Sequence, residues 1–372
     1  MLSYHNLEEI LKKPKGFSHL FLKIRICLSL LGKSKKIPLV DKSELNRIFK
    51  SFSDYNILII GDVMVDAYAW GEVDRISPEA PVPIFSCSSR ENRLGGAANV
   101  ALNIKSLGAN PILCSVIGDD DRGKDFVNLL SEIQQEQSGI VVSSHRRTTV
   151  KTRFISNNQH VIRIDEEDTH ELADEIEAEF IQHVLSLMES QKIHAIVFED
   201  YDKGLITKKL IETVTDSAKQ MKIPVLVDPK KRHYSDYKNV TLFKPNFKEF
   251  VEGSNLNLNK GDIKGLFNAA KQFQLEMGIE KLLITLSELG VFISNENTYE
   301  HIPAVVRKIA DVSGAGDTVI SVATLCLAAG MNAAEIAAIS NLAGGIVCEI
   351  PVVVPIDKEQ LLSESLKLYA NA

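Results

Sequence analysis

Cysteine is scarce and scattered in this chain of 372 residues, which carries only five. No two of them form a CxxC pair and none lies at the spacing of metal ligands, which excludes a zinc site or redox centre built on neighbouring cysteines. Buried free thiols in a reducing cytoplasm are the favoured interpretation. The cysteines are Cys27, Cys87, Cys114, Cys326 and Cys348.

Long apolar runs and a dinucleotide fingerprint are also absent. No run reaches the ~18 residues that a membrane-spanning helix needs, so no transmembrane segment is expected. Residues 61–66 read GDVMVD rather than GxGxxG, which argues against a dinucleotide-dependent oxidoreductase. Residues 118–125 read GDDDRGKD and match a P-loop except at the last position, where Asp125 replaces the Ser or Thr that binds Mg²⁺. We interpret that segment as a charged strand-to-helix turn.

Positive charge is concentrated in residues 1–40. They hold eight Lys or Arg against two Glu, a net charge of +6, so the other 332 residues carry −13 of the total charge of −7. The acidic majority argues against nucleic-acid binding. Residues 17–33 are apolar with interleaved Lys23 and Arg25, which suits an amphipathic helix on a membrane surface or partner, a poorly ordered leader, or translation from an upstream start. Without a small-residue cleavage site, a signal peptide is not expected.

From residue 41 onward, short apolar runs alternate with helical stretches. This alternation predicts a mostly parallel α/β sheet with helices on both faces, forming one domain over 41–372. The predicted strands are 57–61, 112–116, 195–198, 225–227 and 282–285, and the predicted helices lie near 96–107, 121–136, 171–190, 205–221 and 260–277. Ligands of such sheets bind beyond the carboxyl ends of the strands.

Two segments interrupt this alternation. Residues 68–90 and 147–165 contain short, alternating, β-branched runs, which predict a small antiparallel β lid over the site. Exposed lid strands would favour a homodimer through edge pairing.

The segment 311–319, DVSGAGDTV, carries the strongest functional signal. Gly314, Ala315 and Gly316 open an apolar helix over 318–329, and the unpaired amides and positive dipole of such a helix end suit a phosphate. Asp317 lies in the first turn, where the dipole is expected to keep it ionised and ready to accept a hydroxyl proton. This combination indicates phosphoryl transfer to an alcohol.

Two further clusters could bind a sugar. Asp62 and Asp66 follow the first strand and could accept hydrogen bonds from hydroxyl groups, or could simply solvate a strand end. Gly95 and Gly96 allow close approach of a ligand and Asn99 can donate and accept, although a glycine pair is also an ordinary helix start.

Two more clusters could bind a nucleotide. Asn246 and Glu249, three residues apart, could hold a hydrated Mg²⁺ near phosphates, or could form a helix capping box. Residues 285–290, TLSELG, could contact phosphates or ribose, or form a tight turn.

From about residue 55 to the end, these motifs resemble the ribokinase-like (PfkB) family of sugar kinases. RISPEAPVP at 75–83 beside GGAANVALNI at 95–104 narrows the resemblance to kinases of D-glycero-β-D-manno-heptose 7-phosphate. The other shared motifs are GDVMVD, DYDKG (200–204), VDPK (227–230), KPNFKE (244–249) and DVSGAGDTV. The resemblance implies ATP-dependent phosphorylation at O1, a step towards ADP-heptose and lipopolysaccharide core synthesis in the cytoplasm.

The resemblance also implies roles for individual residues. Asp317 would be the base, and Gly314, Ala315 and Gly316 the anion hole. The sugar would be held by Asp66, Gly95, Gly96 and Asn99. Asn246 and Glu249 would organise Mg²⁺, while ATP would lie among Thr285, Ser287, Gly290 and Asn341. A monovalent cation supporting the loop before Asp317 is left open. The substrate's 7-phosphate needs a cation, for which Arg75, Lys151, Arg153 and Arg163 in the lid are candidates, unless they are solvated charges.

Three departures from the family pattern stand out. Relatives often carry glycine where Ser287 stands, and a glycine-containing turn where Pro351 and Val352 stand. Many relatives continue into a nucleotidyltransferase domain, whereas this chain lacks an HxGH motif, so we expect a kinase whose pathway uses a separate nucleotidyltransferase. The alternatives are a PfkB kinase of another sugar or nucleoside, and a non-catalytic sugar-phosphate-binding protein.

Overall fold

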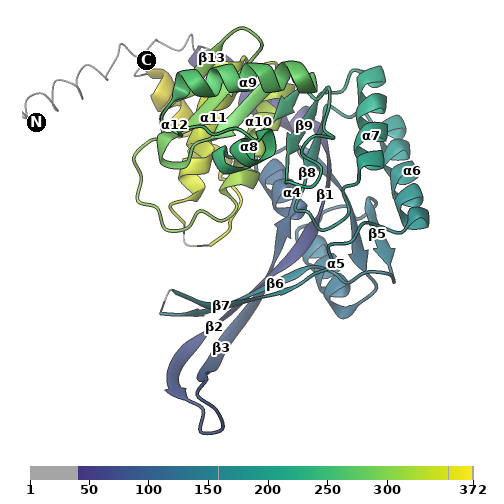
Figure 1. The fold of residues 1–372 in the computed structure, drawn as a ribbon, viewed down its shortest axis with the longest axis vertical. Coiled ribbons are helices and arrows are strands. Elements are labelled where there is room, and N and C mark those ends of the chain that lie inside the picture. Colours follow the sequence, from purple (N-terminus) through teal and green to yellow (C-terminus); the bar gives the residue numbers. More distant parts are fainter. Residues whose placement is uncertain (1–40, 158, 351, 371–372) are drawn as a thin grey trace, which may run out of the picture. The chain divides into compact units, whose positions relative to one another are not determined.

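A nine-stranded sheet forms the centre of the fold (Figure 1). The computed structural model describes residues 41–157, 159–350 and 352–370, so our interpretations of residues 1–40 and of Pro351 lie outside the described residues. Contacts gather the described residues into one unit. Among the helices of the described residues, none is long and apolar enough to cross a membrane.

The strand order of this sheet is β13-β12-β11-β10-β9-β8-β1-β4-β5. Every neighbouring pair from β5 to β11 is parallel, and β12 and β13 add an antiparallel edge, which confirms the predicted mostly parallel α/β fold. The strands are β1 (Asn56–Gly61), β4 (Asn110–Gly118), β5 (Ile140–Ser143), β8 (Ala195–Glu199), β9 (Val225–Asp228), β10 (Leu242–Phe243), β11 (Lys281–Thr285), β12 (Val291–Ser294) and β13 (Tyr299–Ile302).

Both faces of the sheet are buried under helices. In β1, Ile57 and Ile59 enter one apolar cluster while Leu58 and Ile60 enter the other, because successive side chains of a strand point to opposite faces. The first cluster is completed by α3 (Lys42–Ser51), α4 (Ala97–Ser106), α5 (Asp121–Glu132), α10 (Ala315–Ala328), α11 (Ala333–Val347) and α12 (Lys358–Ala370). The second is completed by α6 (Asp174–Ser190), α7 (Lys208–Met221), α8 (Phe247–Ser254) and α9 (Ile263–Met277). We call this sheet with its helices the body.

The predicted body strands and helices are present with small shifts in their ends. The largest shift is in α5, which was predicted to reach residue 136 but ends at Glu132, since Gln134 takes a left-handed backbone with φ of 53°. The turn before α5 is charged as predicted, and Asp120 caps the helix by accepting a hydrogen bond from the amide of Gly123.

A second, four-stranded sheet projects from the body and forms the lid (Figure 1). It consists of β2 (Val63–Ile76), β3 (Pro83–Gly96), β6 (Val150–Ser156) and β7 (Gln159–Glu166) in the order β3-β2-β6-β7. The hairpins β2–β3 and β6–β7 are antiparallel as predicted. They join through a parallel pairing of β2 with β6 that the sequence did not predict, because side-chain alternation does not reveal the direction of a neighbouring strand.

Candidate active site

A pocket of about 490 Å³ opens at the carboxyl ends of the body strands. It brings together residues from β9, the start of α8, the end of β11 and the start of α10, as expected for a ligand site in a parallel sheet. Seven of the predicted site residues line it: Asn246, Glu249, Thr285, Ser287, Gly314, Gly316 and Asp317.

The start of α10 faces this pocket. Gly314 takes a left-handed backbone with φ of 74°, which glycine adopts without strain, and no side chain caps the helix. The Ala315 amide donates to the backbone oxygen of Val312 at 3.3 Å, so the amides of Gly316 and Asp317 are the ones left for an anion, and the helix dipole favours negative charge at this end. Of the predicted anion hole of Gly314, Ala315 and Gly316, the Ala315 amide is therefore already engaged in the turn before α10.

Asp317 lies in the first turn of α10 and is buried. Its Oδ1 accepts a hydrogen bond from the Tyr201 hydroxyl at 2.8 Å, and its Oδ2 accepts one from the Asn99 amide at 2.7 Å. Burial raises the pKa of Asp317 above its usual value, although these two hydrogen bonds oppose the shift. Burial therefore opposes the ionised state that we expected the helix dipole to favour.

Asn99 reaches Asp317 because α4 packs against α10. Asn103, one turn further along α4, donates to the backbone oxygen of Asn99 at 2.8 Å and accepts from the Thr318 hydroxyl at 3.2 Å. The amide of Ile356 also donates to Asn103, at 3.0 Å. This buried network fixes Asn99 beside the carboxylate.

The site also contains charged and polar residues that we did not predict, among them the following four. Lys244 is buried, and its Nζ lies 2.6 Å from Oδ2 of Asp228. Glu199 ends β8, and one carboxylate oxygen from each of Glu199, Asp228 and Asp317 lies within 4.8 Å of the others. Tyr201 is the fourth. DYDKG and VDPK, which end or follow β8 and β9, were the available signal, since strand ends of a parallel sheet meet at one edge.

Asp62 plays the structural role that we left open. It is buried, and it accepts hydrogen bonds from the backbone amides of Tyr201, Lys203 and Leu205 at 3.0 to 3.2 Å. Burial raises the pKa of Asp62, and the three amides oppose that shift. Asp62 therefore shapes the loop that carries Tyr201, and its prediction as a direct sugar ligand is not supported by this geometry.

Gly95 and Gly96, at the end of β3, allow this lid strand to approach the start of β2 and the residue that follows β1. A side chain on Gly95 would collide with the carboxylate of Asp66, and one on Gly96 would collide with the backbone oxygen of Asp62. Gly96 also has a positive φ of 62°, so both positions need glycine. Asp66 itself is buried and forms an ion pair with Arg153.

The predicted lid cations do not share one location. Arg153 lies over the ring of Tyr68, 5.4 Å from its centroid, and Arg93 of β3 lies 5.5 Å from the same centroid. Lys151 pairs with Asp165 at 3.3 Å and with Glu167 at 3.1 Å. These cations lie on the part of the lid next to the body.

Two of the predicted cations are badly placed for a phosphate near Asp317. Arg75 is exposed and stands nine residues beyond Asp66 in β2, about 30 Å along an extended strand. Arg163 pairs with Asp165 on β7, a strand that is exposed at every position. The length of β2, which the short sequence pattern did not reveal, explains the position of Arg75, whereas Arg163 is set apart by the exposure of β7.

Asn246 and Glu249 form the capping box of α8. The amide of Glu249 donates to Asn246 at 2.9 Å, the amide of Asn246 donates to Glu249 at 2.8 Å, and Lys230 lies 2.7 Å from the second carboxylate oxygen of Glu249. Both side chains nevertheless line the pocket and keep further oxygen lone pairs, so contact with a hydrated cation is sterically compatible with the cap.

The turn from Thr285 to Gly290 forms the rim of the pocket. Ser287 has a positive φ of 52°, the backbone region that glycine prefers, in agreement with the glycine that relatives often carry there. Gly290 has a φ of 89° and no room for a side chain against Ile302, so its role here is structural. Asn341 is not among the pocket residues and donates to the backbone oxygen of Pro303 at 3.0 Å.

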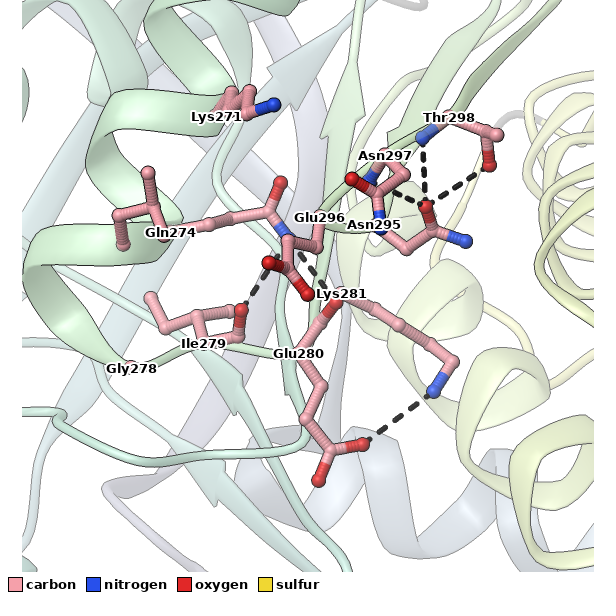
Figure 2. Close-up of a pocket in the computed structure, with 11 residues that line it drawn as sticks. Lys271, Gln274, Gly278, Ile279, Glu280, Lys281, Asn295, Glu296, Asn297 and Thr298 are labelled. Carbon is pink, nitrogen blue, oxygen red and sulfur yellow. Dashed lines mark hydrogen bonds and ion pairs between the residues drawn. The ribbon is translucent and has the colours of Figure 1, made fainter.

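A larger pocket of about 600 Å³ lies at the opposite end of β11, between the end of α9 and the β12–β13 hairpin (Figure 2). Its polar groups bond to one another: Gln274 donates to the backbone oxygen of Glu280, and Lys281 pairs with Glu280 at 3.6 Å. Because parallel sheets bind ligands at the carboxyl ends of strands, we assign the site to the smaller pocket.

The sequence matches the model of the pfkB family of carbohydrate kinases over residues 54–352. It is 38% identical over 311 residues to the bifunctional protein HldE of Geotalea uraniireducens, covering 82% of this chain and 62% of that protein. It is 40% identical over 294 residues to HldE of Aliarcobacter butzleri, covering 78% and 60%. The chain thus spans less than two thirds of the length of these relatives.

The fold is similar to solved sugar kinases of low sequence identity. Phosphofructokinase-2 from Escherichia coli in complex with potassium has a TM-score of 0.70 at 18% identity, covering 85% of this chain and 99% of the other. Arabidopsis thaliana ribokinase complexed with ribose and ATP has a TM-score of 0.64 at 14% identity, covering 83% and 98%. Since the family model matches most of its length, the chain belongs to the pfkB family of carbohydrate kinases.

Proposed function

We propose that this protein transfers the γ-phosphoryl group of ATP to O1 of D-glycero-β-D-manno-heptose 7-phosphate, which gives the 1,7-bisphosphate. The observation that carries the proposal is the buried Asp317 at the uncapped start of α10. The choice of heptose rests on RISPEAPVP beside GGAANVALNI and on the similarity to HldE proteins. The product would feed ADP-heptose and lipopolysaccharide core synthesis in the cytoplasm.

In this reaction Asp317 accepts the proton of the attacking hydroxyl. The anomeric hydroxyl of a sugar is more acidic than a simple alcohol, so a carboxylate is a sufficient base. Tyr201 and Asn99 hold the two oxygens of Asp317 and fix the direction in which it faces the acceptor. The amides at Gly314 and Gly316 would stabilise charge on the transferring group, a contribution of about 10²–10³ in kcat for a typical donor.

The nucleotide and its metal have a suitable set of protein groups. Thr285, Ser287 and Lys260 line the rim, and Asn246 and Glu249 would hold Mg²⁺ through water. Magnesium would neutralise charge on the phosphates. A monovalent cation under the loop before Asp317 is part of the proposal, supported by the potassium of the similar phosphofructokinase-2, and turnover in potassium against tetramethylammonium buffers tests it.

The substrate would be enclosed between the body and the lid. Asp66, Asn99 and the glycines at 95 and 96 would surround the sugar, and the cations beside Tyr68 would face its 7-phosphate. Among the predicted lid cations we now favour Arg153 and Lys151 over Arg75 within one chain, because both lie near Asp66 in the sheet.

A homodimer is a further part of the proposal. Ile76 and Val82 at the lid tip and Ile162 and Ile164 on β7 are exposed apolar side chains, which a second lid could cover. The tip also carries most of RISPEAPVP, which lies far along the lid from Asp66 of the same chain. In a homodimer, this segment could contribute to the site of the partner chain instead. Light scattering of the chain and of an Ile162→Glu variant tests this, with a monomeric wild type as the contrary result.

A PfkB kinase of another sugar or nucleoside is the second candidate, favoured by the structural likeness to phosphofructokinase-2 and ribokinase. ADP release should be measured with heptose 7-phosphate, fructose 6-phosphate, ribose and adenosine, using Asp317→Asn as the inactive control. Phosphorus NMR of the product identifies the 1,7-bisphosphate. Activity confined to another acceptor would overturn the heptose assignment, and sugar-phosphate binding without ADP release would indicate a non-catalytic binding protein. The pathway's nucleotidyltransferase would act on the product.

A further inference from the structure

Arg307 is a largely buried cation in a segment whose apolar side chains are exposed. Residues 303–314, which we call the connecting segment, lead from the end of β13 to the start of α10, and within this described range they form no helix or strand. Val306 is 99% exposed and Ile309 is 63% exposed, whereas the side chain of Arg307 is only 10% exposed. Apolar packing therefore contributes little to holding this segment, and the buried cation needs an explanation.

Carboxylates from two different parts of the fold hold Arg307. Its Nη1 donates to Glu349, just after α11, at 2.7 Å, and its Nη2 donates to Glu364 in α12. Gly345 of α11 makes room for the guanidinium group, since a Cβ at that position would lie 3.1 Å from Nε of Arg307. The planar fork of an arginine suits such paired contacts, which a lysine ammonium cannot reproduce. The surroundings are thus shaped for an arginine.

The backbone of the connecting segment is fixed at the same end of α11. The amides of Ala310 and Asp311 donate to the backbone oxygen of Cys348 at 2.8 Å and 3.2 Å. The carboxylate of Asp311 in turn accepts a hydrogen bond from the amide of Ser313 at 2.9 Å, just before the start of α10. Cys348 adjoins Glu349, so the side-chain and backbone contacts hold the connecting segment at one place.

The start of α10 depends on the connecting segment for its position. No side chain caps the helix at this end, and Val312 and Gly314 of the segment line the pocket together with Asp317. Amides that stabilise a transferring phosphoryl group must already point at it when the reaction begins. A misplacement of about 1 Å, caused by a change far from the chemistry, can lower a rate by about 10²-fold.

We propose that Arg307 is a positioning residue for phosphoryl transfer. By bridging Glu349 and Glu364, it holds the connecting segment against α11 and α12, so that the start of α10 is in place before the nucleotide binds. Arg307 is not among the residues that line the pocket, so it acts through the connecting segment rather than by contact with the substrates. This inference rests on the proposed function, because it concerns the same reaction.

Steady-state kinetics of Arg307→Gln test the proposal. We expect kcat to fall about 10- to 100-fold, because the amides of α10 act on the transition state. KM for the sugar phosphate should stay unchanged, since Asp66 and Asn99 lie on other elements. Arg307→Lys keeps the charge but cannot bridge two carboxylates with one planar fork, so it should recover part of the activity. The matched control is Lys308→Gln, which removes a positive charge at the exposed neighbouring position and should leave kcat unchanged.

Hydrogen exchange followed by mass spectrometry gives a second measurement, which needs no substrate. Exchange reports the local opening of a segment. In Arg307→Gln, the amides of residues 303–314 should exchange faster than in the wild type, whereas those of β1 should exchange at the same rate.

Unchanged kcat in Arg307→Gln would overturn the proposal, even if the free energy of unfolding falls, because Arg307 would then support stability alone. A fall in kcat without faster exchange in the connecting segment would overturn it too. If Arg307→Gln does not fold, Glu349→Gln replaces it. That side chain is 38% exposed and supplies one of the two contacts, so the same changes are expected on a smaller scale.

Failure of this inference is distinguishable from failure of the proposed function. A wild type that phosphorylates the heptose, with an equally active Arg307→Gln variant, keeps the function and loses the inference. A wild type that phosphorylates another acceptor loses the heptose assignment, and the variants are then compared with that acceptor. A wild type that phosphorylates no acceptor overturns both.

Discussion

The body and the lid hold their charged residues in different ways. At the mouth of the body, Glu199, Asp228 and Lys244 are all less than 5% exposed, and Lys244 forms a short ion pair. On the lid, the strand β7 is exposed along its whole length and its Arg163 pairs with Asp165 at the surface. Buried charges are held in fixed positions, whereas exposed pairs are screened and interchangeable. We therefore expect substitutions in the body to change the reaction rate. We expect substitutions in the part of the lid next to the body to change the choice of substrate.

The largest expected effect is on the catalytic side of this comparison. Asp317→Asn keeps the size of the side chain but removes the proton acceptor, so we expect kcat to fall by about 10²–10⁴. ATP binding, measured by calorimetry, should change little, because the amides at the start of α10 remain. An enzyme with near-normal kcat would mean that the base lies elsewhere, and circular dichroism provides the control for folding.

Stability offers the next contrast between buried and exposed pairs. Lys244→Met leaves Asp228 buried without its cation and should lower the free energy of unfolding by about 3–5 kcal/mol. The matched surface change is Glu212→Gln, which breaks the pair with Lys208 on α7 and should cost about 0.3–0.5 kcal/mol. Urea unfolding in EDTA, which removes any bound metal, measures both. An equal loss of unfolding free energy in the two variants would mean that the buried ion pair is no more important for stability than the exposed one.

The affinity for the sugar phosphate should depend on lid residues next to the body but not on those of the exposed strand β7. Arg153 pairs with Asp66 beside Tyr68, while Arg163 lies opposite Arg153 on the exposed strand. Loss of a hydrogen bond to a charged group is worth about 1.5–3 kcal/mol, so Arg153→Gln should raise KM for the sugar phosphate by roughly 10- to 100-fold. Arg163→Gln should leave KM nearly unchanged. The same rise in both variants would show that only the overall charge of the lid matters.

The pH dependence should sharpen the assignment of Asp317. Activity requires the ionised carboxylate, so kcat/KM falls as the pH drops through the pKa of Asp317, which burial has raised. The hydrogen bond from Tyr201 lowers that pKa, and Tyr201→Phe removes it, so the acidic limb of the profile should move to higher pH. A limb that stays in place or moves to lower pH would contradict the role of Tyr201 in holding the base ionised.

The sequence predicted features that depend on neighbouring residues, but it could not predict contacts between residues far apart in the chain. Periodicity reveals β1 and α9 because their burial follows from local pattern, and the helix start at Gly314 is legible because its residues are adjacent. Tyr201 and Asn99 were different: they meet Asp317 across 116 and 218 residues, contacts that only the folded sheet creates. Arg75 was misplaced because nothing in the local pattern gives the length of β2.

Ser287 provides the smallest expected effect, at the rim of the body pocket. Its left-handed backbone costs about 1–2 kcal/mol for a non-glycine residue, whereas glycine adds roughly 0.5–1 kcal/mol of chain entropy to folding. Ser287→Gly should therefore raise the free energy of unfolding by no more than about 1 kcal/mol, as measured with urea. Gly290→Ala in the same turn is the matched opposite, because its side chain would collide with Ile302 at a φ of 89°. A loss of stability in Ser287→Gly would mean that the serine hydroxyl contributes more than its backbone strain costs. In that case the position of the Ser287 side chain at the pocket, rather than the backbone of the turn, would explain why serine occupies this position.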